Sequence, residues 1–220
     1  MKLTIQILLF VISVFVLTGC GISQKSMILH KDTIIKESIK KNMIFKVDKV
    51  ILKGDLPNPT LYMFTITDKD INQALIQNLK NFYQVDNDNS EYQIICEIDF
   101  TASEFTSLDK KVIMNATYKI YKNHKNLLKR DITSKYIAKV NIAESIAHTL
   151  AWGVSIPLNK TTDSFKNVEL EKIGYPVDKS VTLTSSDGAE RLKAAYAGAI
   201  RINFAKFLQE LQKISFLNEQ

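Results

Sequence analysis

Alternating apolar and polar residues predict a β-sheet in the middle of the chain. Apolar side chains occupy every second position in three successive runs, at residues 92–100, 112–121 and 127–140. This alternation is typical of strands with one buried and one solvated face. Residues 123–126 indicate a hairpin between the last two runs, and residues 43–52 add an earlier strand. We therefore predict an antiparallel sheet of about four strands, covered on one face.

One helix is predicted before the three alternating runs. Apolar residues between positions 71 and 82 recur at helical spacing. Thr67 suits the N-cap position, and Asp70 stands three residues later, where a capping box usually has Glu or Gln. We expect the helix to end near Tyr83, and residues 61–66 to form a short extended piece before it.

The last third of the chain has a different pattern. A stripe of apolar residues from 192 to 211 predicts a long C-terminal helix, which begins near residue 187 and packs on one face of the sheet. Residues 142–186 form an insert that is first apolar and then polar. Its apolar part is either a helix packed on the sheet or a surface for a partner protein or lipid acyl chains, with Trp152 as an anchor. The candidate partner-binding residues are Ile146, Leu150, Trp152 and Val154.

The N-terminus has the pattern of an export signal. Lys2 precedes an apolar run from residue 5 to residue 17, which is shorter than the roughly 20 residues that a membrane-spanning helix needs. The run ends in Leu17-Thr18-Gly19-Cys20, which resembles the lipobox of bacterial lipoproteins. The resemblance implies a signal peptide over residues 1–19 and lipidation of Cys20. An ordinary signal peptide or a short membrane anchor is the alternative.

A lipidated Cys20 makes a membrane the first expected partner of this chain. Several acyl chains anchor a protein far more firmly than one, which binds only marginally. Gly21, where Asp favours inner-membrane retention in Gram-negative bacteria, suggests the outer membrane, facing the periplasm. Residues 20–42 are predicted to be a tether, which fully extended reaches roughly 70 Å at ~3.3–3.6 Å per residue. The alternative is that Ile34, Ile35 and Ile39 form a turn of helix that docks on the domain. Residues 43–220 then form a single periplasmic α+β domain, with the insert at about 142–186.

Charge and cysteine content change this picture little. The formal net charge is +6, and the scattered lysines indicate a solvated surface rather than attraction to anionic partners such as lipid or lipopolysaccharide. If Cys20 is acylated, Cys96 has no partner in the chain, and its place in an alternating run predicts a buried residue rather than a catalytic thiol. Glu97 and Asp99 are expected on the wet face of the sheet, not as a catalytic pair.

The sequence offers no motif for chemistry. The three histidines, His30, His124 and His148, have no second ligand at metal spacing, and neither a G-x-S-x-G elbow nor a Gly-rich phosphate loop is present. We therefore predict no catalytic residue, cofactor or metal, and not an enzyme. Export argues against a nucleic-acid partner.

The predicted helices and strands also resemble a known group. Similarity covers roughly residues 60–140 and 186–213, and the residues that carry it are Asp70–Leu79, Ala116-Thr117-Tyr118, Ile132-Thr133-Ser134, Gly188–Ala195, Ala199–Phe204 and Phe207–Leu211. In these segments the chain is similar to small proteobacterial outer-membrane lipoproteins of unknown function. Their architecture looks like that of the lipopolysaccharide-assembly lipoprotein, which plugs and helps to fold an outer-membrane barrel. The insert at 142–186 departs from the pattern of the group.

Three functional hypotheses follow from the sequence and this resemblance. The first is a non-enzymatic lipoprotein, anchored in the outer membrane, that acts as an envelope assembly or adaptor protein with an envelope protein or barrel as partner. The alternative is a periplasmic carrier that binds lipid or another amphiphile. The third is an acyltransferase-type enzyme, since some relatives are labelled UDP-N-acetylglucosamine acyltransferase. That class is built on hexapeptide repeats, and this chain has none.

Overall fold

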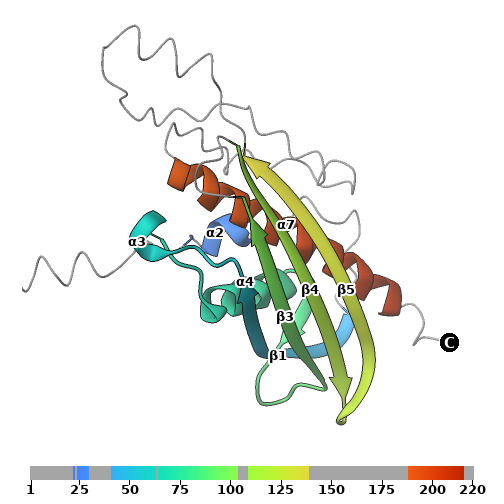
Figure 1. Ribbon diagram of the computed structural model, residues 1–220. Helices are drawn as coiled ribbons and strands as arrows, with labels where there is room; N and C mark the ends of the chain where they lie inside the picture. The colour runs from blue at the N-terminus through green and yellow to red at the C-terminus, as the bar shows by residue number, and fades with distance from the viewer. Residues whose placement is uncertain are drawn as a thin grey trace, which may run out of the picture.

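The computed structural model describes residues 22, 24–29, 41–62, 64–103, 109–138 and 188–215, which form an α+β fold (Figure 1). The strands in this part of the chain are β1 (Lys41–Gly54), β2 (Tyr83–Val85), β3 (Tyr92–Ala102), β4 (Lys110–Lys122) and β5 (Lys125–Ala138). The helices are α2 (Gln24–Met27), α3 (Pro59–Tyr62), α4 (Asp68–Lys80) and α7 (Gly188–Ser215). The predicted fold class, the three alternating strands and the long C-terminal helix are confirmed.

The sheet has five strands and is mixed, which corrects the prediction of about four antiparallel strands. Its order is β2-β1-β3-β4-β5, with β1 parallel to both β2 and β3, and with β3, β4 and β5 antiparallel. The chain leaves β1 and returns to β2 through α4, and such a crossover makes the two strands parallel. β2 has only three residues, too few to show an alternating pattern.

Helix α4 begins as predicted and ends earlier. The Thr67 hydroxyl accepts a hydrogen bond from the Asp70 backbone N–H, and the Asp70 carboxylate accepts one from the Thr67 backbone N–H, so Asp70 completes the capping box. The helix ends at Lys80, and Tyr83, where we expected its end, opens β2. The prediction of an extended piece over 61–66 is also wrong at its start. Residues 61 and 62 belong to the short helix α3, which begins at Pro59, and the first position of a helix suits proline.

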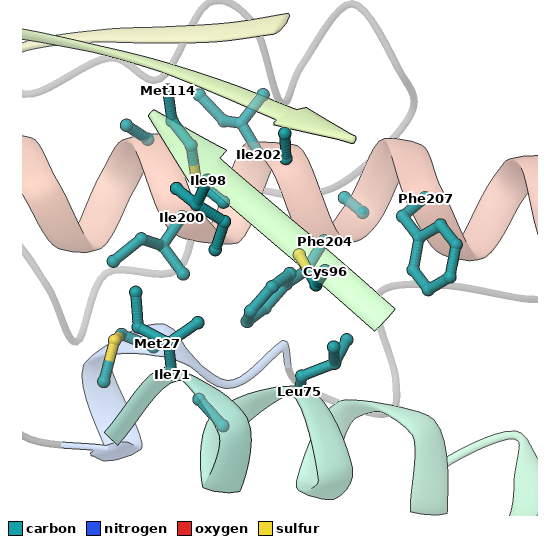
Figure 2. Packing of buried hydrophobic residues seen from close by; sticks show 14 of the residues in the cluster. Met27, Ile71, Leu75, Cys96, Ile98, Met114, Ile200, Ile202, Phe204 and Phe207 are labelled. Carbon is teal, nitrogen blue, oxygen red and sulfur yellow. The ribbon is translucent and has the colours of Figure 1, made fainter. Parts of the chain in front are cut away.

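Among the described helices, α4 and α7 both cover one face of the sheet, and neither packs on the opposite face, which we call the open face. α4 packs against β1 and β2, and α7 packs against β4 and β5. Figure 2 shows Cys96 of β3 with Phe204 of α7 in this core, and Leu75 of α4 close by. Cys96 is fully buried, so the prediction of a buried residue is confirmed, and burial raises the pKa of its thiol to about 12.

A buried polar network joins α7 to the sheet. The Tyr118 hydroxyl donates to Asn203 Oδ1 at 2.7 Å, while Asn203 Nδ2 donates to the carbonyl of Ile132 at 2.9 Å. Ser134 Oγ donates to the carbonyl of Ala199 at 2.7 Å. The Tyr118 ring also stacks on Phe207, with the ring centroids 3.8 Å apart. Because these polar groups are buried, only one position of α7 along the sheet satisfies all of them.

The ends and edges of the sheet are set by local features. Asn123 and His124 have positive φ angles of 49° and 63°, and they form the two-residue turn of the predicted β4–β5 hairpin. At the other end of the sheet, Gly54 has a φ of 79°, and a Cβ there would lie 2.2 Å from the Phe100 carbonyl oxygen. β5 is an edge strand of 14 residues.

A short N-terminal segment completes the core. Ile22, Met27 and Leu29 are buried, with exposed fractions of 3%, 0% and 5%. The Asn78 side chain on α4 accepts a hydrogen bond from the Leu29 N–H at 2.7 Å and donates one to the Met27 carbonyl at 3.1 Å. The part of the predicted tether that the structure describes is therefore packed against the domain. Within the described residues, every helix is too short or too polar to cross a bilayer.

Candidate functional site

The open face of the sheet carries two rows of side chains that cross four strands. Direct neighbours across β1, β3, β4 and β5 make up each row. The first row contains Lys53, Asp99, Asn115 and Thr133, and the second contains Ile51, Glu97, Thr117 and Asp131. Residues of both rows line a shallow groove of about 410 Å³. We call this set of residues the open-face groove.

Five polar side chains of the groove have hydrogen-bond partners in or beside it. Thr117 Oγ1 donates a hydrogen bond to Asp131 Oδ1 at 2.5 Å, and Thr133 Oγ1 donates to Asn115 Oδ1 at 2.8 Å. Glu97 accepts a hydrogen bond from Lys119, which lies two residues after Thr117 on β4. The surface is therefore polar and charged, and its own side chains already satisfy much of its hydrogen bonding.

The electrostatics of the groove suit binding better than proton transfer. The hydrogen bond from Lys119 and then its charge lower the pKa of the Glu97 carboxyl, and the same hydrogen bond raises the pKa of Lys119. Both groups are therefore charged at neutral pH. A general acid needs a raised carboxyl pKa, and burial is the usual cause. Asp99 is exposed and Glu97 half-buried, so the prediction that both lie on the wet face is confirmed.

The described residues contain no cluster of His, Cys, Asp or Glu that could hold a metal ion. His124, the one histidine in this part of the chain, lies in the β4–β5 turn, at the end of the sheet opposite to Gly54. The hydroxyls of Thr117 and Thr133 in the groove donate hydrogen bonds to Asp131 and Asn115 rather than to a histidine base.

The site residues predicted from the sequence lie outside the described residues. These are the lipidation site Cys20 and the candidate partner-binding residues Ile146, Leu150, Trp152 and Val154. Glu97 and Asp99 lie on the face predicted for them, whereas the other members of the groove were not predicted from the sequence. The strand register that brings the four strands together was the missing information, since polar residues on a wet face carry no local signal of their own.

Comparison with known proteins does not assign this chain to a family. No family model and no curated protein matches it. Among solved structures, it is similar to lipoprotein GNA1162 from Neisseria meningitidis, at 9% identity and a TM-score of 0.34, over 50% of this chain and 98% of the other. It is also similar to the hypothetical protein CT253 from Chlamydia trachomatis, at 8% identity and a TM-score of 0.38, over 73% and 98%. Likenesses with such TM-scores assign neither fold nor function.

Proposed function

We propose that this protein is a lipid-anchored lipoprotein of the outer membrane that acts without catalysis, as an assembly or adaptor protein in the cell envelope. The sequence Leu17-Thr18-Gly19-Cys20 supports the anchor. The open-face groove supports the adaptor role, and it is the observation that carries the proposal. A broad polar sheet face with ionised side chains such as Glu97 and Lys119 supports recognition of another protein by complementary charge.

The location of the groove also fits this role. The helices occupy the opposite face of the sheet, so a partner can approach the groove without displacing α4 or α7. In this proposal the partner is an envelope protein such as an outer-membrane barrel. Charged side chains at its contact surface then set the orientation and the rate of association more than the strength of binding.

The structure offers less support for a carrier that holds an amphiphile between sheet and helices. Such a carrier needs an apolar cavity in this position. The described side chains there belong to one buried hydrophobic cluster. Ile98, Phe204 and Phe207 are each at most 1% exposed. We therefore place the adaptor role first.

Photo-crosslinking in living cells tests the adaptor role. A photoreactive amino acid at Asp99 or Thr133 should capture the same envelope protein, since both positions are exposed in the groove. The matched control is Gln77, an exposed position on α4 in the helical layer. Equal capture from Gln77, or different proteins captured from Asp99 and Thr133, would refute the groove as the contact surface.

Mass spectrometry of the mature N-terminus tests the anchor separately. We expect the protein to begin at Cys20 and to carry acyl chains there. The variant Cys20→Ser should accumulate as an uncleaved precursor and leave the outer-membrane fraction. If Cys20→Ser is found in the outer-membrane fraction in unchanged amount, acylation of Cys20 does not hold the protein in the membrane.

A further inference from the structure

The N-terminal segment is held in the core by the end of α4. Besides the Asn78 contacts, Asn81 Nδ2 donates a hydrogen bond to the Leu29 carbonyl at 3.2 Å. Leu29 therefore lies beside the end of α4. Met27 belongs to the same core cluster as Ile71, in the first turn of that helix, and Figure 2 draws the two next to each other. Helix α2 packs against both α4 and α7, and in Figure 1 it lies on the side of the domain where α3 is, far from the β4–β5 turn. The buried Ile22 precedes α2 by two residues in the sequence.

This packing limits the distance between the domain and a lipid anchor. Ile22 is buried and is only two residues from Cys20. Two extended residues span at most about 7 Å. If Cys20 carries lipid, as the proposed function requires, the domain therefore rests against the bilayer. A 20-residue tether would have let it move freely above the membrane.

An exposed apolar loop lies at the same end of the domain. The segment from Asp55 to Leu61, which includes the first residues of α3, leaves β1 and leads into α4. Tyr196, near the start of α7, donates a hydrogen bond to the Asp55 carbonyl, so the loop is fixed at the end where both long helices begin. Leu56 and Leu61 are 42% and 51% exposed.

The composition of the loop matches the boundary between headgroups and acyl chains. It contains two prolines and no lysine or arginine, and its one charged residue is Asp55. The Asp55 carboxylate accepts a hydrogen bond from the Ala102 N–H at 3.1 Å, which directs it toward the sheet. Exposed leucines beside a membrane anchor gain free energy when they enter the apolar boundary of the bilayer.

We propose that Leu56 and Leu61 insert into the outer membrane and form a second contact with lipid beside the acylated Cys20. The anchor brings this end of the domain to the bilayer, and the leucines fix its orientation. The β4–β5 turn is at the other end of the sheet and then points away from the membrane.

The test uses an environment-sensitive fluorophore on the acylated full-length protein in vesicles of phosphatidylethanolamine and phosphatidylglycerol. The label is attached to Leu61→Cys, and the matched control is Leu127→Cys. Leu127 is 52% exposed and Leu61 is 51% exposed, so the two positions are matched in exposure. Leu127, however, lies beside the β4–β5 turn. Cys96 is buried in the core and does not react with the label.

We expect the label at position 61 to shift its emission to shorter wavelength, to lose quenching by aqueous iodide and to be quenched by spin-labelled lipid. The label at position 127 should show none of these changes. If Cys20 is acylated and both labels respond like groups in water, membrane insertion is refuted while the lipid anchor stands. If the N-terminal peptide carries no lipid, the anchor fails, and the proposed insertion fails with it.

Discussion

Replacement of Asn78 by leucine tests how the N-terminal segment is held. The two side chains have the same number of heavy atoms and the same branching, and leucine is the larger, so the change removes hydrogen bonds without leaving a cavity. Within the packed segment, the Leu29 N–H and the Met27 carbonyl lose their Asn78 partner. A buried polar group without a partner costs about 1–3 kcal/mol, so the two together cost about 2–6 kcal/mol if the segment stays in place.

Release of the segment offers a cheaper outcome. Burial of Ile22, Met27 and Leu29 contributes about 1.5–3 kcal/mol for each side chain, which sums to about 4.5–9 kcal/mol. Ordering the backbone of the seven described residues, 22 and 24–29, costs about 1–2 kcal/mol for each residue, or roughly 7–14 kcal/mol. Apolar burial alone therefore does not hold the segment, and the hydrogen bonds decide. We expect Asn78→Leu to release the segment while the rest of the domain stays folded.

Hydrogen exchange measures this release directly. In a variant that begins at Gly21, the Leu29 amide should be protected in the wild-type background and should exchange rapidly in Asn78→Leu. Amides in the centre of β4 should keep their protection, because local opening does not require global unfolding. Gln77→Leu is the control, since Gln77 is exposed on the same helix. Unchanged protection of Leu29 in Asn78→Leu would refute the assigned role of this side chain.

Three further predictions concern the core. Asn203→Ala leaves the buried Tyr118 hydroxyl without its acceptor and should lower the free energy of unfolding in urea by about 2–4 kcal/mol; an unchanged midpoint would contradict this. Gly198→Ala puts a Cβ 2.5 Å from the Tyr136 ring, so we expect a loss of about 1–3 kcal/mol in thermal unfolding, and a neutral effect would exclude the close contact. Burial raises the pKa of Tyr118 well above 10, and that of Tyr83 to about 12. The contribution of these two tyrosines to the free energy of unfolding should therefore be fully present below pH 10, the ordinary tyrosine pKa. It should be lost as the pH rises through their folded pKa values. Tyrosinate absorbance followed together with circular dichroism tests this, and ionisation of both rings near pH 10 in the folded protein would disprove it.

Local sequence patterns were sufficient for most of the elements. β3, β4, β5 and α7 were predictable because alternation and helical spacing depend on neighbouring residues, and the cap at Thr67 needs only the next three positions. The parallel pairing of β1 was not predictable, since the choice of strand partner is made between residues far apart in the sequence. Strand β1 is also irregular. Its register shifts between Val47 and Lys49, and this shift changes which of its side chains face inward.

The candidate site was less predictable for the same reason. The groove combines residues from four strands, and no single strand shows that its polar side chains meet those of the others. The packing of Met27 and Leu29 was missed because its main polar partner is one amide on α4, and an asparagine at Asn78 looks like any other polar residue in the sequence. Tertiary contacts, rather than local preference, decide both features.

In the described sheet β5 is an edge strand, which has a consequence if the proposed lipid anchor confines the molecules to one surface. Proteins confined to a plane collide often, and a 14-residue edge strand is a template for pairing with the same strand of a neighbour. Lys125, Lys129 and Lys135 are exposed along β5. Two such strands brought together would set like charges against each other, so mutual repulsion keeps neighbouring copies from merging their sheets at high surface density.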